Sequence, residues 1–109
     1  MAQSRDPVRM AALDLMCAVT EDRRRLGDAA PVLLEPLEPG GRARALRLAT
    51  GTLRQLQRCD RMLGPHLRRR PWPRTMNALR LGTYELCAEA GAPHGVVNAM
   101  VGLLRTNRT

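Results

Sequence analysis

The sequence contains no lysine and no phenylalanine, and its aromatic residues are one tryptophan and one tyrosine. A hydrophobic core must therefore be built from leucine, valine, methionine and alanine, which favours helix packing over a sheet. Hydrophobic residues still make up 44% of the 109 positions, a composition typical of folded proteins. No apolar run approaches the ~20 residues of a membrane-spanning helix, and MAQSRDPVRM lacks the apolar segment of a secretory signal. We expect one soluble, cytoplasmic domain over residues 1–109.

Signatures of catalysis and metal binding are also missing. Cys17, Cys59 and Cys87 lie far apart without a CxxC pair, which predicts three free thiols in a reducing compartment. His66 and His94 each adjoin a proline and have no cysteine or carboxylate at metal-ligand spacing. There is no glycine-rich phosphate loop and no nucleophile elbow. We therefore expect this chain to be no enzyme and to hold no metal or cofactor itself.

The positive charge consists of arginine alone and is unevenly spread. Residues 1–40 carry five arginines and seven acids, whereas residues 41–109 carry thirteen arginines and three acids. Residues 42–74 alone hold ten arginines against Asp60. A guanidinium can bind phosphate through two hydrogen bonds and can stack on bases. The asymmetry indicates a polyanionic partner, with nucleic acid favoured over an acidic protein.

Apolar residues at intervals of three and four predict helices along most of the chain. Asp6 followed by Pro7 is typical of a helix start, with an N-cap residue and a proline at the first helical position. Further helical segments, separated by prolines and glycines, are expected as a short turn within 28–41, a long helix over 42–61, a short piece over 62–67, and helices over 73–90 and 93–105. No strand pattern is found, so the predicted fold class is all-α.

The predicted helix 42–61 has an apolar arc and, nearly opposite, an arginine stripe about 25 Å long. The apolar arc consists of Ala45, Leu46, Ala49, Leu53 and Leu56. Solvated helix faces usually mix charges of both signs, and this stripe does not. We therefore predict an RNA-binding surface made of Arg42, Arg44, Arg47, Arg54, Arg58 and Arg61, extended by Arg68, Arg69, Arg70 and Arg74.

A few single residues carry further expectations. Asp60 is expected to cap a helix or to pair with an arginine of its own helix. Cys17 and Cys87 lie on apolar faces and are interpreted as small core residues. Trp72 could stack on a base or pack between two helices as an apolar anchor, and the scarcity of aromatics favours packing. The buried face of the helix over 73–90 is expected to consist of Met76, Leu79, Thr83, Leu86, Cys87 and Ala90.

In their order and spacing, several segments resemble the NusB-like family of helical RNA-binding domains. VRMAALDLM resembles the family's R-x-x-A opening helix, and ARALRLATGTLRQLQRCDRML resembles its L-x-x-G-x-L-R…D helix. The segment RTMNALRLGTYELCAEAGAPHGVV resembles its L-R-L-x-x-Y-E-L…P-x-x-V stretch. The resemblance implies an RNA-binding bundle of about five helices. It also adds Arg5 and Arg9, which match the family's basic amino-terminal region, as secondary RNA-binding candidates.

Two branches of that family compete. GTLRQLQRCDRMLGPHL resembles the amino-terminal domain of bacterial rRNA cytosine-5 methyltransferases of the Sun, Fmu or RsmB type, and this branch is favoured. The free-standing transcription antitermination factor, which binds RNA and a ribosomal protein, usually carries an acid after P-x-x-V, where this chain has VNAM. The favoured branch implies 16S rRNA as the partner and S-adenosylmethionine only in a separate catalytic domain.

The resemblance also implies a fragment that lacks the family's last helix and the catalytic domain, which would be a further partner. The apolar face left uncovered on the last two helices then predicts self-association or a loosely ordered C-terminal segment. A protein-interaction module, or a domain that packs its basic face on an acidic partner, stays open as an alternative.

Overall fold

The computed structural model describes residues 6–88 together with Asn98 and Gly102. In this part of the chain it consists of helices without strands, which confirms the all-α prediction. The elements are α1 (Pro7–Thr20), α2 (Leu26–Leu33), α3 (Pro39–Arg54), α4 (Leu56–Leu63), the short 3-10 helix η1 (Gly64–His66) and α5 (Pro73–Ala88).

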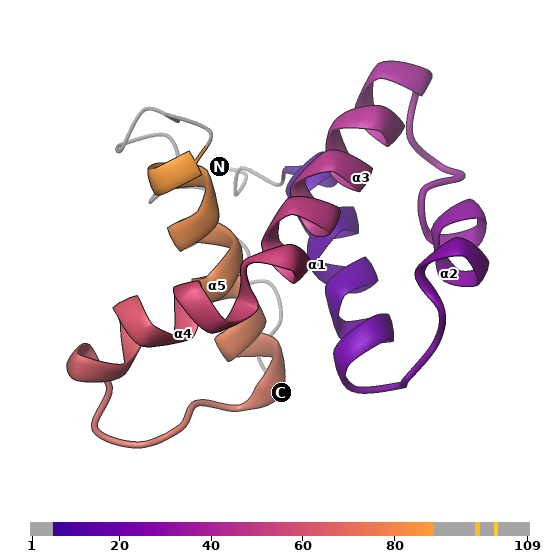
Figure 1. Cartoon of the computed structure of the whole chain (residues 1–109). Coiled ribbons are helices and arrows are strands. Elements are labelled where there is room, and N and C mark those ends of the chain that lie inside the picture. Colours follow the sequence, from indigo (N-terminus) through magenta and orange to yellow (C-terminus); the bar gives the residue numbers. More distant parts are fainter. Residues whose placement is uncertain (1–5, 89–97, 99–101, 103–109) are drawn as a thin grey trace.

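Helix α1 lies at the centre of the fold and packs against α2, α3 and α5 (Figure 1). It begins where the sequence predicts, because an Asp6 carboxylate oxygen accepts a hydrogen bond from the Arg9 backbone N–H at 3.1 Å and Pro7 takes the first helical position. The core around it is made of alanine, leucine and methionine, as expected from the lack of aromatics. Its buried residues in α1 are Ala11, Ala12, Leu13, Leu15, Met16 and Ala18.

Helices α3 and α5 approach closely at Gly51. A Cβ atom on this glycine would lie 2.1 Å from the hydroxyl oxygen of Tyr84 and 2.3 Å from its Cζ atom. Such distances are far below van der Waals contact, so only glycine fits against this tyrosine ring. Tyr84 in turn packs against the aliphatic core.

The predicted single helix over 42–61 is wrong, because α3 ends at Arg54 and α4 begins at Leu56. Gln55 between them has φ −111° and ψ 21°, and α4 leaves the line of α3 (Figure 1). The buried Thr52 hydroxyl donates to the Leu48 carbonyl at 2.7 Å, a type of contact that often bends helices. The predicted apolar arc also shifts, since Leu46 is 38% exposed while Leu48 is fully buried.

The predicted buried face of α5 is partly wrong. Met76 is buried, but Leu86 and Cys87 are exposed. Three polar residues of this helix are buried instead, namely Asn77, Arg80 and Glu85. Apolar periodicity cannot find such residues, because each is buried only by virtue of a partner on another helix. Ala90 lies outside the described residues, and of the predicted helix over 93–105 only Asn98 and Gly102 are described, both helical.

Candidate nucleic-acid interface

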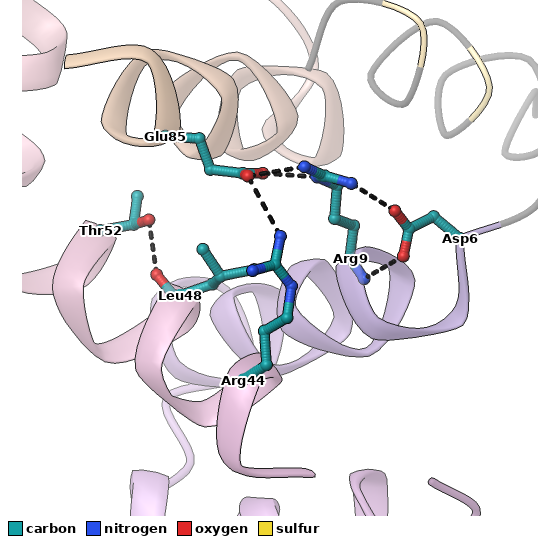
Figure 2. A network of polar contacts seen from close by, with 6 residues as sticks. All are labelled: Asp6, Arg9, Arg44, Leu48, Thr52 and Glu85. Carbon is teal, nitrogen blue, oxygen red and sulfur yellow. Dashed lines mark hydrogen bonds and ion pairs between the residues drawn. The ribbon is translucent and has the colours of Figure 1, made fainter. Parts of the chain in front are cut away.

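Glu85 of α5 is an internal carboxylate that holds α1 and α3 (Figure 2). It is 2% exposed, and its two oxygens accept hydrogen bonds from Arg9 Nε at 2.5 Å and Arg9 Nη2 at 2.7 Å. Arg44 Nη2 lies 3.6 Å from the same carboxylate, and Arg9 Nη1 also pairs with Asp6. The hydrogen bond to Glu85, together with the one to Asp6, raises the pKa of Arg9 above its ordinary value. Arg9 and Arg44 thus direct their charge into the fold.

A second internal pair joins α4 to α5. Arg80 donates to Asp60 through Nε at 2.7 Å and through Nη2 at 2.8 Å, and its Nη1 donates to Asn77 at 2.9 Å. The prediction that Asp60 caps a helix or pairs within its own helix is therefore wrong. Burial raises the pKa of the Cys59 thiol, which donates to the Arg80 carbonyl at 3.6 Å. The Arg80 hydrogen bonds lower the pKa of Asp60.

The lowered pKa of Asp60 predicts an acid-sensitive contribution to stability. A carboxylate whose pKa is lower in the folded than in the unfolded state stabilises the fold above its unfolded pKa of about 4. That contribution disappears as the pH falls through the lower, folded value. We expect Asp60→Asn to reduce the free energy of unfolding by about 1 kcal/mol at pH 7, because Arg80 loses its charged acceptor while solvent screens a carboxylate whose side chain is 35% exposed.

Urea denaturation of both proteins between pH 7 and pH 2 measures this difference. The difference in the free energy of unfolding should shrink as the wild-type Asp60 carboxylate becomes protonated. Asp22→Asn, which removes an exposed carboxylate from the connection between α1 and α2, should change stability little at any pH. A difference between Asp60→Asn and wild type that stays constant down to pH 2 would contradict the role of the charged pair.

Arg74 and Arg42 also hold the fold. Arg74 Nη2 lies 2.6 Å from an Asp14 carboxylate oxygen of α1 and 3.3 Å from the sulfur of Met10. Arg42 donates to the carbonyls of Leu34 at 3.2 Å and Glu35 at 2.8 Å, where α2 ends. The Leu34 carbonyl also accepts the Leu37 backbone N–H at 3.0 Å, so Arg42 reinforces the turn that follows α2.

The arginines at the end of α3, in α4 and in the connection that follows η1 are arranged differently from Arg42 and Arg74. Arg54, Arg58 and Arg61 border a shallow hollow of about 400 Å³ where α3 meets α4, together with Gln55 and Gln57. These three arginine side chains are exposed and form no ion pair or hydrogen bond with another described residue. The same holds for Arg68, Arg69 and Arg70, which follow η1. We call Arg54, Arg58, Arg61, Arg68, Arg69 and Arg70 the arginine surface.

The connection after η1 passes near α4 at Arg70. The guanidinium of Arg70 lies near enough to Asp60 of α4 to add to the lowering of its pKa, after the larger effect of Arg80. The connection 67–72 therefore returns beside α4. Of the remaining predicted residues, Arg47 is exposed on α3, and Arg5 lies outside the described residues.

Trp72 does not pack between two helices, and that prediction is wrong. Its side chain is 83% exposed at the end of the connection that leads into α5. Tyr84, the other aromatic residue, contributes to the core instead. The exposure leaves an aromatic face next to the arginine surface.

The described residues show neither a metal site nor a membrane span. Within 6–88, 98 and 102, no three histidine, cysteine or carboxylate side chains are grouped so that they could hold an ion. Among the helices of the same residues, none is both long enough and apolar enough to cross a bilayer.

An all-α domain with internal carboxylate–arginine pairs and an open cationic surface defines a class of small helical domains suited to binding polyanions. The family model described as NusB matches residues 6–109, and the chain belongs to the NusB family. Domains of this family are generally RNA-binding. Comparison with curated proteins and with solved structures found no match.

Four of the motif residues that carry the family resemblance form the ion pairs that join the helices. Arg9 of the R-x-x-A helix meets Glu85 of the Y-E-L motif, and Arg80 of the L-R-L motif meets Asp60. Sequence reasoning missed these pairings across helices. A signal for them exists, because Asp60 and Glu85 are the only acids between residues 41 and 88 in a strongly basic half of the chain. A carboxylate isolated among arginines is a candidate for an internal ion pair.

Proposed function

We propose that this domain binds structured RNA through the sugar–phosphate backbone, using the arginine surface. The observation that carries the proposal is the grouping of Arg54, Arg58 and Arg61 around one hollow, with no carboxylate partner among the described residues. Each guanidinium can donate two parallel hydrogen bonds to a phosphate. The adjacent Arg68, Arg69 and Arg70 extend the same positive field along the connection before α5.

Contacts to phosphate position a nucleic acid without reading its sequence. We therefore propose that the domain orients an RNA for chemistry carried out elsewhere. The resemblance of GTLRQLQRCDRMLGPHL supports 16S rRNA as that RNA and a separate S-adenosylmethionine-dependent methyltransferase domain as the site of the chemistry. The alternative is the antitermination factor, which would require a ribosomal protein as a second partner. The salt titration described next also addresses this alternative.

Replacing Arg54 and Arg58 by alanine is expected to weaken RNA binding and to flatten its salt dependence. Each phosphate contact contributes about 0.7–0.9 to the slope of log affinity against log salt, so the double variant should lose about 1.4–1.8. A salt titration against a 16S rRNA fragment and an unrelated hairpin of equal length measures both the slope and the preference. A preference for the rRNA fragment would support the methyltransferase branch.

Arg24→Ala with Arg25→Ala is the matched control, since it removes two exposed arginines from the connection between α1 and α2, on the side of the molecule away from α4 (Figure 1). This variant should retain nearly the wild-type slope, because charges beyond a Debye length are largely screened. An unchanged slope in the Arg54 and Arg58 variant would count against the arginine surface. Binding of a partner that persists at high salt would favour the protein-interaction alternatives.

A further inference from the structure

Trp72 is presented to solvent by a rigid piece of backbone. It is the only tryptophan of the chain and is 83% exposed, whereas large aromatic side chains are usually highly buried. Pro71 and Pro73 flank it and restrict the backbone on both sides. The Trp72 carbonyl accepts a hydrogen bond from the Met76 N–H at 2.8 Å, which is the first helical bond of α5. The backbone that carries this side chain is therefore fixed by the start of a helix.

In the sequence segment around Trp72 the charge is of one sign. The exposed residues Arg68, Arg69 and Arg70 precede it, and the sequence holds no acid between Asp60 and Glu85. Both of those acids are engaged by arginines inside the fold. Three consecutive arginines without an acid near them in the sequence create a positive field that suits the phosphates of a nucleic acid.

We infer that Trp72 stacks on an unpaired base of the bound RNA while Arg68, Arg69 and Arg70 contact the phosphates on either side of that base. An aromatic ring beside arginines is the arrangement with which proteins hold single-stranded nucleotides. A fully paired helix offers no free base face, so this contact selects loops, bulges or single-stranded ends. The inference rests on the proposed function and adds to it the kind of RNA element that is recognised.

The test uses the full 109-residue chain and two RNAs with equal numbers of phosphates, a single-stranded oligonucleotide and a fully paired duplex. Because Trp72 is the sole tryptophan, its fluorescence reports stacking directly. We expect the single strand to quench this fluorescence and the duplex to leave it nearly unchanged. Fluorescence anisotropy of dye-labelled RNA then measures affinity for variants that lack the tryptophan.

Trp72→Ala should weaken binding of the single strand by roughly 5- to 150-fold, the equivalent of about 1–3 kcal/mol for one stacked base, and should leave duplex binding unchanged. Trp72→Tyr should retain most of the affinity, because it keeps an aromatic plane. Val32→Ala is the matched control, since it trims an apolar side chain that is 64% exposed on α2. Circular dichroism should show the same helix content in all variants.

The outcomes separate this inference from the proposed function. If both RNAs bind with a steep salt dependence, without quenching and with equal affinity for Trp72→Ala, the stacking inference is overturned and the arginine surface stands. If neither RNA binds at low salt, both are overturned, and a protein partner becomes the occupant to test. Two results together support both the stacking inference and the proposed function: the single strand quenches the fluorescence, and Trp72→Ala loses affinity for the single strand but not for the duplex.

Discussion

Glu85→Gln is expected to lower the free energy of unfolding by about 3 kcal/mol, because the substitution keeps the shape of a buried side chain but removes its charge. Arg9, whose side chain is 15% exposed, would then retain a buried guanidinium without the carboxylate that accepts two of its hydrogen bonds. Asp6 would remain as a partner of Arg9, but it contacts only one nitrogen of the guanidinium. Arg44 can turn towards solvent, since its side chain is 41% exposed.

Urea denaturation at pH 7 measures this loss, and thermal unfolding should show a decrease in Tm of roughly 10 °C or more for a domain of this size. Glu35→Gln, which neutralises an exposed glutamate after α2, is the matched control and should change stability by less than about 0.5 kcal/mol. Replacing both partners, as in Arg9→Met with Glu85→Leu, should cost less than Glu85→Gln alone, because the buried guanidinium is removed and the two groups that lose a partner, Asp6 and Arg44, can reach solvent. A double variant that is less stable than the single one would contradict this account.

Gly51→Ala should destabilise the fold by about 2 kcal/mol, although alanine is a better helix former than glycine. The added methyl group would lie 2.1 Å from the Tyr84 hydroxyl oxygen, so the tyrosine ring must move or α3 and α5 must separate. Gly40→Ala in the same helix is the control, because a Cβ atom there meets nothing within 4 Å. That variant should be neutral or slightly stabilised.

A double-mutant cycle with Tyr84→Leu tests the cause of the destabilisation. In the Tyr84→Leu background the ring is gone, so Gly51→Ala should cost little or should stabilise α3 through helix propensity. Denaturation of the four proteins gives the coupling between the two positions. If Gly51→Ala costs the same with and without the tyrosine ring, the close approach of α3 and α5 at this point does not explain the need for glycine.

Much of this fold can be predicted from the sequence, because local signals and the tertiary structure agree there. Asp6 and Pro7 begin α1, Pro73 begins α5, and the core is aliphatic. The break at Gln55 was not predictable from apolar spacing, since the residues on both sides favour a helix. It accompanies a hydrogen bond of the Thr52 hydroxyl to the backbone, which hydrophobic periodicity does not register.

The candidate site was predictable only as a region of charge. Composition identifies the basic half of the chain, but it cannot distinguish an arginine that binds a carboxylate from one that faces solvent. The sequence pattern grouped Arg42 and Arg74 with Arg58. In the structure Arg42 and Arg74 instead bind groups within the fold, a backbone carbonyl and a carboxylate. Trp72 was misplaced for a related reason, because scarcity of aromatics favours a core position and exposure depends on where the chain turns.

The location of the motif residues inside the fold has a consequence for how RNA preference could change in evolution. Arg9, Asp60, Arg80 and Glu85 hold the helices together, whereas Arg58 and Trp72 contribute nothing to those pairs. A descendant could therefore exchange Arg58, Arg61, Arg68, Arg69 and Arg70 and still display the motifs by which its ancestry is known. Membership of the NusB family thus predicts the scaffold, whereas in the function we propose the choice of RNA depends on the outward side chains of α4 and of the connection that leads to α5.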